Sequence, residues 1–527
     1  MALRPLRRAR RGRLRRSRGG LRDGGGVVSP GAAIAAIVVV TAATVTIGAL
    51  GLRISRTTSD FYVASRSVSP GLNSSAISGE YLSAASFLGI AGLVLTFGAD
   101  MLWYPIGWTT GYLLLLVFVA APLRRSGAYT IPDFAQLRLG SSGVRLTSTW
   151  LVVGVGWLYL MPQFQGAGLT VQATTGAPQW VGTALVAVVV LVNVVSGGMR
   201  SITFVQAFQY WVKLTAMLVP LAFLALVWRA DGSPSPVAAE QWFAPLGAVT
   251  PQSLYTTYAV IIATFLGTMG LPHVVVRFYT NPDGRAARRT TLLVLALLGM
   301  FYLLPTAYGV LGRIYAPDLV DAGHADTVVL ELPGRMIDGV GGDALAALLM
   351  GGAFAAFLST SSGVTMALAG VVGQGLGRRG PWRGRLSAVA ALRWAAAACV
   401  TVPLALGLLA QPIPVANSVV FAFALAASTF CPLLVLGIWW RGLTAPGAVA
   451  GLVGGGLAAT AAPLLTLTIA PGGWLGTLLA QPAAWSVPLG FALMIGGSLL
   501  TRSRVPADVS RTMVRLHTPE GLRLDRS

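Results

Sequence analysis

Residues 69–98 read SPGLNSSAISGEYLSAASFLGIAGLVLTFG, a stretch that is long enough to cross a bilayer as a helix. Its first half, however, holds Asn73, Gly79, Glu80 and several serines. Hydrocarbon offers these groups no hydrogen-bond partner, so they must face protein or a water-filled cavity. A charge at the bilayer centre costs about 2.5–3.5 kcal/mol on insertion scales, which places Glu80 inside a helix bundle. Glycine among serines at mid-depth predicts a helix that unwinds near Gly79 and frees backbone carbonyls for an ion.

The composition is typical of a protein with many membrane spans. Of the 527 residues, 55% are hydrophobic and only 10% are charged, and the mean hydropathy is +0.71. Soluble chains carry about 25% charged residues. The net charge of +21 would suit a nucleic-acid partner, but the arginines lie in tails and short loops. There they set membrane orientation instead, so we predict a multi-pass protein of the cell (plasma) membrane with no nucleic-acid partner.

The residues that usually bind metals or carry out catalysis are sparse. Cys399 and Cys431 lie inside apolar segments and have no CxxC partner, and the three histidines are far apart in the sequence. The chain also lacks an HExxH motif and paired intramembrane acids. We therefore expect no resident metal cluster and no enzyme activity.

Hydropathy predicts an all-α protein with about 13 transmembrane helices. A basic, disordered tail is expected over residues 1–26 and an extra first span over 31–52. The remaining spans are expected at about 71–97, 102–122, 147–171, 179–197, 204–228, 255–278, 291–312, 344–372, 389–411, 417–439, 445–469 and 486–501. The last two form a C-terminal pair over 445–501, and a basic tail over 502–527 follows. In this pair, Gly447, Gly451 and Gly455 repeat every four residues, a spacing that suits close helix packing.

The distribution of arginine predicts the orientation of the chain. Most loop arginines follow odd-numbered spans or lie in the C-terminal tail, whereas only Arg229, Arg313 and Arg335 lie in the other loops. Positively charged loops stay on the cytoplasmic side, so we expect a cytoplasmic C-terminus. With thirteen spans the arginine-rich tail 1–26 would be outside, against the same rule. Either the tail is exported, or it is not part of the mature protein, or the first span is miscounted, and we favour a start-site or processing artefact.

Two interrupted helices begin two blocks of five spans, over 71–228 and 255–439. The second interrupted helix contains TFLGTMGLPHVVVRF, in which Gly267, Gly270 and Pro272 break the apolar run as Gly79 does in the first. Broken segments at matching positions in two halves indicate an inverted repeat. Each break offers freed carbonyls for a cation and a half-helix N-terminus that suits an anion. This pattern favours a secondary transporter.

Three segments carry a resemblance to a known family: GEYLSAASFLGIAGLV, YTIPDFAQLRLG and LGTMGLPHVVVRFYTNPDGRAARR. They resemble the sodium:solute symporter family, most of all its cation/acetate branch, which takes up short monocarboxylates. The resemblance runs over about residues 60–441. It implies the five-plus-five inverted-repeat fold of leucine-type transporters, with one extra span before the core and two after it.

The resemblance also implies a sodium site between the first and eighth core helices. Matched to the family pattern, it implies backbone carbonyls from Gly79, Leu82 and Ala356 and hydroxyls from Ser359 and Thr360. The alternative for the two hydroxyls is helix packing through bonds to the preceding turn. Glu80 is expected to attract the cation or to couple a proton, unless it is a solvated charge at a vestibule. The substrate candidates surround the two breaks and are Ser83, Ala84, Ser86, Phe265, Gly267 and Thr268, any of which could instead serve packing.

Departures from the family pattern narrow the function. The sugar and proline branches often carry an aspartate where this chain has Gln206, and they lack an acid at the position of Glu80. We therefore expect cation-coupled symport of a small carboxylate such as acetate by alternating access, with Na⁺ as the coupling ion and H⁺ as the alternative. Other open readings are a proline-like amino acid, pyruvate or propionate as the substrate, and a solute sensor instead of a transporter. The sequence predicts no oligomeric state.

Overall fold

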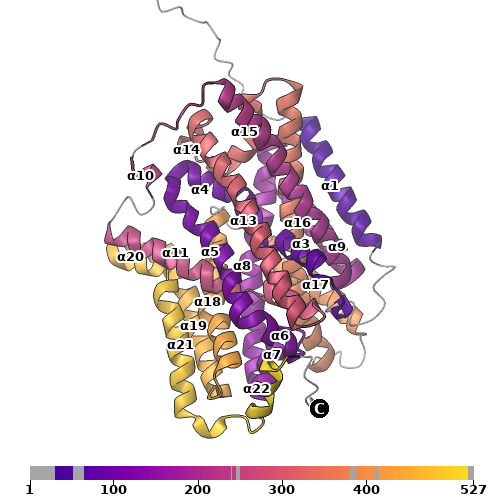
Figure 1. Cartoon of the computed structure of the whole chain (residues 1–527), viewed down its shortest axis with the longest axis vertical. Coiled ribbons are helices and arrows are strands. Elements are labelled where there is room, and N and C mark those ends of the chain that lie inside the picture. The colour runs from indigo at the N-terminus through magenta and orange to yellow at the C-terminus, as the bar shows by residue number, and fades with distance from the viewer. Residues whose placement is uncertain are drawn as a thin grey trace, which may run out of the picture.

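The computed structural model describes residues 30–50, 64–238, 240–244, 250–379, 387–409 and 415–519, and every regular element within these ranges is a helix (Figure 1). The tail predicted over 1–26 lies outside the described residues. Eleven helical runs in the described ranges are long and apolar enough to cross a membrane. An all-helical architecture follows from the bilayer, since a helix satisfies its own backbone groups.

Two of the eleven runs reverse direction inside the bundle. Helix α9 (Gln179–Ala230) turns at Gly198, whose φ of 60° and ψ of −160° are readily adopted only by glycine. Asn193 and Val205, on either side of this turn, both lie next to Gly48, so the two halves of α9 run antiparallel. The run over 85–126 turns at Gly98, whose φ is 75°. With these two reversals the described part of the chain makes thirteen passes, as predicted.

Both predicted helix breaks are present, but Gly79 itself lies inside α3, where its missing side chain allows close packing on Gln206. Helix α3 (Pro70–Tyr81) ends before Leu82, and the chain resumes as a π-helical turn η3 (Ala85–Gly89) that leads into α4 (Ile90–Phe97). Helix α11 (Pro251–Gly270) is separated from α12 (Pro272–Val276) by Leu271, which is extended with ψ of 121°. Pro272 explains this break, because proline lacks an N–H and disfavours a helical residue before it.

The prediction that Gly267 interrupts the second helix is wrong. Gly267 lies within α11, where the helix continues for three more residues to Gly270. A Cβ at Gly267 would collide with the backbone of Phe423 in α18 (Val415–Trp439). This glycine therefore serves close packing of two helices, and the proline causes the break.

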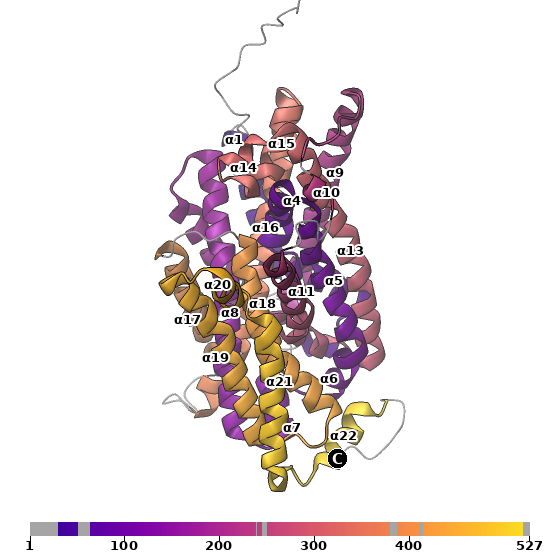
Figure 2. The same cartoon turned by 90° about the vertical axis from the view of Figure 1, so that its left-hand side faces the viewer.

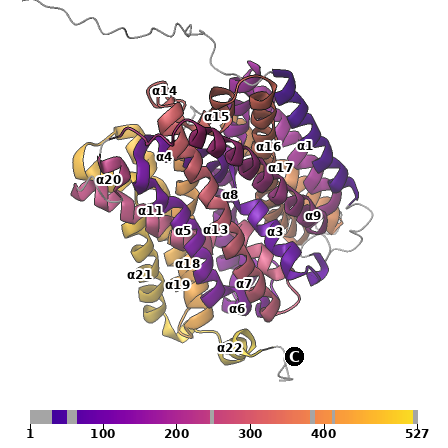
Figure 3. The same ribbon diagram turned by 45° about the horizontal axis from the view of Figure 1, so that its top comes forward.

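The other helices enclose the two breaks. The second half of α9 packs against α3 and α16, and α1 lies at the outer edge beside α9 and α16 (Figure 3). The α-helices whose bounds have not been given above are α1 (Pro30–Leu50), α5 (Trp103–Leu114), α6 (Ala120–Ser126), α7 (Ile131–Leu139), α8 (Ser142–Thr175), α10 (Glu240–Phe243), α13 (Gly284–Tyr315), α14 (Asp318–Asp321), α15 (Val328–Met336), α16 (Val340–Arg379), α17 (Ala388–Leu409), α19 (Ala445–Ile469), α20 (Gly473–Ala480), α21 (Ala483–Leu500) and α22 (Val509–His517).

The two ends of the bundle differ in their elements (Figure 2). Helices α4, α14 and α15 lie at one end, and α6, α7 and α22 lie at the other. The second end gathers arginines from α6, from the start of α13 and from α22. This grouping matches the expected cytoplasmic loops, although the side of the membrane that each end faces stays a prediction.

The glycine repeat of α19 lies against its neighbours. A Cβ at Gly447 or Gly451 would meet α21, and a Cβ at Gly455 would collide with the carbonyl of Ser428 in α18. Small residues therefore let three backbones approach closely, which is how helices gain packing energy in a medium as apolar as their side chains. The predicted packing role of this repeat is confirmed.

We predict that Gly455→Ala lowers the thermal unfolding midpoint of the purified protein in detergent. Overpacking against a backbone carbonyl costs about 1–3 kcal/mol. Gly496→Ala in α21 is the matched control, because nothing lies within 4 Å of its added Cβ. Both changes gain the same helix propensity, so their difference isolates the packing cost. Equal midpoints for the two variants would contradict this account.

Candidate functional site

The break after α3 frees backbone carbonyls in the middle of the bundle, and α16 supplies partners for two of them. Ser359 Oγ donates to the Gly79 carbonyl at 2.7 Å, and Thr360 Oγ1 donates to the Glu80 carbonyl at 2.6 Å. All four residues are fully or almost fully buried. The broken helix is thus held against the Ser-Thr pair of α16, in the arrangement that the resemblance implies.

A third helix reaches the same carbonyls. Lys213, in the second half of α9, donates from Nζ to the Gly79 carbonyl, to the Leu82 carbonyl at 2.8 Å and to Ser359 Oγ at 2.8 Å. Its side chain is completely buried, so it does not extend to the membrane surface. An ammonium group has three N–H donors, and each of them has an oxygen partner here.

The five expected sodium ligands are close together, but three of them contact an atom of the chain itself. Gly79, Leu82 and Ser359 contact Lys213 Nζ. Ala356 accepts a hydrogen bond from Ser359 Oγ at 3.1 Å, and the Thr360 hydroxyl is used by Glu80. A cation that is already fixed among these oxygens does not leave a position that fits a sodium ion. Their role as sodium ligands therefore stays a prediction.

The sequence contains a signal for this contact. Lys213 is the one lysine of the chain, which otherwise carries its positive charge on arginine. It lies in a membrane span, where a buried ionisable residue is by default functional. Its presence there can be read from the sequence, whereas its partners cannot, because they come from α3 and α16.

Glu80 and Arg277 form a buried ion pair beside this cluster. Arg277 Nε lies 2.6 Å from Glu80 Oε2, and the two side chains are 1% and 3% exposed. The same guanidinium donates to Thr203 Oγ1 at 3.0 Å and to Gln206 Oε1. Gln206 Nε2 in turn donates to the Ser359 carbonyl at 2.8 Å. Glu80 is therefore not a solvated vestibule charge. Arg277 links α3 to α9, and Gln206 extends this link to α16.

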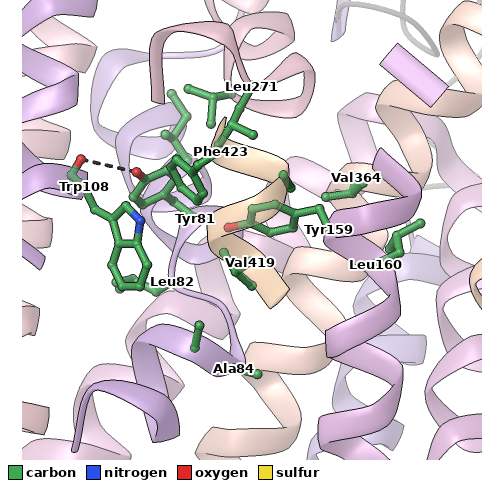
Figure 4. Close-up of a cluster of buried hydrophobic side chains, with 14 of the residues drawn as sticks. Tyr81, Leu82, Ala84, Trp108, Tyr159, Leu160, Leu271, Val364, Val419 and Phe423 are labelled. Carbon is green, nitrogen blue, oxygen red and sulfur yellow. Dashed lines mark hydrogen bonds between the residues drawn. The ribbon is translucent and has the colours of Figure 1, made fainter. Parts of the chain in front are cut away.

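Aromatic side chains surround the start of the second half-helix (Figure 4). The Trp108 ring lies 5.9 Å from both Phe423 and Tyr302, between ring centroids, and Tyr159 lies 6.0 Å from Phe423. Leu82 and Ala84, at the break, lie beneath these rings. Trp108 Nε1 is buried and has no hydrogen-bond partner among the described residues. This region therefore combines aromatic side chains with a buried donor, Trp108 Nε1, that lacks an acceptor among the described residues.

Polar groups at the break are held by other helices. The Ala84 backbone N–H donates to Gln163 Oε1 of α8 at 3.1 Å, and Ser86 Oγ lies 3.0 Å from the Tyr302 hydroxyl. Such an N–H has no partner within its own half-helix, so a side-chain or ligand oxygen must accept from it. Gln163 therefore occupies the position that suits an anionic oxygen.

The other substrate candidates lie in different surroundings. Ser83 is buried next to the break. Thr268 Oγ1 is hydrogen-bonded to the Tyr81 hydroxyl at 2.7 Å and donates to the Thr264 carbonyl at 2.7 Å, so it holds the Tyr81 hydroxyl in place. Phe265 is half-buried, with its backbone against α5. The structure therefore brings Ser83, Ala84 and Ser86 together at the break, whereas Phe265, Gly267 and Thr268 lie on packing faces of α11.

The profile of the sodium:solute symporter family matches residues 61–455. The chain belongs to this family. It is therefore a multi-pass membrane protein and a solute symporter rather than an enzyme. Two relatives from bacteria match nearly the whole chain. An uncharacterized symporter, YwcA, of Bacillus subtilis is 29% identical over 91% of this chain and 97% of its own length. A monocarboxylic acid transporter of Corynebacterium glutamicum is 30% identical over 90% of this chain and 92% of its own length.

A solved structure of another protein has the same fold as this chain. It is described as the substrate-bound outward-open state of a Na⁺-coupled sialic acid symporter, with a TM-score of 0.66 and 13% identity over 88% of this chain and 98% of that chain. At this identity the likeness establishes the fold alone. The chain thus has the leucine-transporter-type core of two five-helix repeats, as predicted.

We predict that Arg277→Met strongly destabilises the protein, because it leaves the Glu80 carboxylate buried without its partner. Breaking one side of a buried ion pair costs about 3–5 kcal/mol. The double variant Glu80→Gln/Arg277→Met removes both charges and should recover most of that loss. Thermal unfolding in detergent, followed by tryptophan fluorescence, measures both. If the double variant loses as much stability as the single variants Glu80→Gln and Arg277→Met lose in sum, the two residues are not coupled.

Proposed function

We propose that this symporter accumulates a short monocarboxylate of the acetate type by cation-coupled alternating access. The observation that carries the proposal is the half-helix start at Ala84, whose N–H is satisfied only by the side chain of Gln163. Unwound helices in transporters point such N-termini at anionic substrate groups. The carboxylate would bind at this N-terminus, next to Ser83 and Ser86.

The charge of the neighbouring cluster favours an anion. Lys213 and Arg277 carry two positive charges and Glu80 carries one negative charge, which leaves one net positive charge at the break. A helix N-terminus adds about 0.3–1 kcal/mol of favourable energy for a nearby anion, and more when it is partly buried. A neutral or cationic solute would gain nothing from this arrangement.

The walls of the region favour a small apolar group. Trp108 lies 5.9 Å from both Tyr302 and Phe423, measured between ring centroids, and a short alkyl chain would pack against these rings. Trp108 Nε1 would donate to the second carboxylate oxygen. The name of the relative from Corynebacterium glutamicum, a monocarboxylic acid transporter, supports this substrate class. Proline carries a cationic ammonium group, so it would bind less well against these aromatic rings than a short alkyl chain.

The coupling ion is a cation, with sodium and the proton as the two candidates. The family name favours sodium, whereas the buried acid Glu80 keeps the proton as the alternative. The positive-inside distribution of arginine supports a cytoplasmic C-terminus. In that orientation the end that holds α6, α7 and α22 would open to the cytoplasm.

We predict concentrative uptake of radiolabelled acetate into proteoliposomes that contain the full chain. Uptake should require an imposed cation gradient and collapse when an ionophore dissipates it. Pyruvate and propionate should compete with acetate, and proline should compete at least tenfold more weakly, about 1.4 kcal/mol less in binding energy. Binding without accumulation under both sodium and proton gradients would favour a solute sensor and contradict symport.

A second prediction tests the carboxylate position. Gln163→Glu would place a negative charge at the Ala84 N–H and repel the substrate, so we expect the KM for acetate to rise at least about tenfold. Gln172→Glu is the matched control, because the same change is made on the same helix at an exposed position. The control should transport acetate normally. Equal KM values for the two variants would place the carboxylate elsewhere.

A further inference from the structure

We propose that the Lys213 ammonium group takes the place of the coupling sodium ion at the break of α3, so that this symporter does not bind sodium there. The inference departs from what the family name implies, and it concerns the cation position rather than the substrate. It therefore stands independently of which carboxylate is carried.

The contacts of Lys213 are those expected of a bound cation. Nζ is held by the carbonyl oxygens of Gly79 and Leu82 and by the hydroxyl oxygen of Ser359. These are three of the five oxygens that the resemblance implies for sodium. The side chain has no exposed surface, so the ammonium group is not in contact with bulk solvent. The chain therefore satisfies the freed carbonyls with a covalently tethered positive charge.

The chemistry of lysine suits this position better than arginine. An ammonium group is a compact point charge whose three donors can rotate to meet three converging oxygens, whereas a guanidinium is a planar fork. The chain uses arginine for its other 37 basic residues and lysine only here. The single exception thus occurs where a sodium-like shape and charge are needed.

The fixed charge also excludes a second cation. Two unit charges about 4 Å apart, in an effective dielectric constant of about 20, repel strongly enough to weaken sodium binding roughly a thousandfold. Thr360 Oγ1 donates its proton to the Glu80 carbonyl at 2.6 Å, which holds this hydroxyl against α3. A sodium ion at this position would have to displace Lys213 from all three oxygens.

A tethered cation has a consequence for transport. Sodium can leave its site with the substrate, whereas Lys213 stays attached to α9. The positive charge therefore stays with the protein, and a sodium gradient cannot act through this position. Any sodium dependence of acetate uptake must then arise at a different site.

The experiment compares ²²Na⁺ binding to the purified full chain and to variants by scintillation proximity. The wild-type protein should show no saturable binding that depends on Ser359. Lys213→Ala removes the ammonium group and leaves the oxygens of Gly79, Leu82 and Ser359, so it should gain saturable ²²Na⁺ binding. The amount of bound ²²Na⁺ should be at least about tenfold above the wild-type background. The double variant Lys213→Ala/Ser359→Ala removes one ligand and should lose the gain. Saturable sodium binding by the wild-type protein that Ser359→Ala abolishes would overturn the proposal.

A measurement on the wild-type protein avoids reliance on a variant that could fail to fold. Because the chain has one lysine, ¹⁵N-lysine labelling gives a single side-chain amine signal in solid-state NMR. We expect the Nζ signal to stay unchanged when potassium is replaced by sodium. A sodium-specific shift or loss of contact with the Leu82 carbonyl carbon would overturn the proposal. Absence of acetate uptake under every gradient would instead contradict the proposed substrate and leave the cation result standing.

Discussion

The structure depends on one constraint, namely that a helix broken inside a bilayer must find partners for its freed carbonyls within the protein. The break after α3 exposes the carbonyls of Gly79, Glu80 and Leu82. Ser359, Thr360 and Lys213 satisfy them from two other helices. The packing of α3 against α9 and α16 is therefore polar at its centre, where these hydrogen bonds hold the broken end of α3 in place.

Those hydrogen bonds continue into the ion pair. Arg277 contacts Glu80 and also holds Gln206, whose other amide atom bonds the Ser359 carbonyl. The second broken helix, through Arg277, is thus connected to the first through Glu80 and to α16 through Gln206. A change in the position of any one helix must break charged hydrogen bonds that water cannot replace, which costs more than at a surface. Such a network can hold two discrete arrangements, as alternating access requires.

The sequence predicted the helices and the broken segments well because both depend on local chemistry. Thirteen passes follow from apolar length, and the second break follows from Pro272. Gly267 was misinterpreted because a glycine that permits close packing and a glycine that breaks a helix look alike in a sequence. The partners of Lys213 could not be predicted either. They are separated from it by more than 130 positions, and only the tertiary fold brings them together.

The resemblance to the family and the geometry of this chain therefore answer different questions. Motif similarity identifies residues that can supply oxygens, and Gly79 and Ser359 do lie together as the resemblance implies. It does not identify the atom that those oxygens bind, because that atom comes from a separate helix with its own sequence. Sodium and an ammonium group are both compact monovalent cations that prefer converging oxygens, so the same ligand set serves either. The difference between them is that one diffuses and the other is covalently attached, and this difference decides whether a gradient of that cation can drive the carrier.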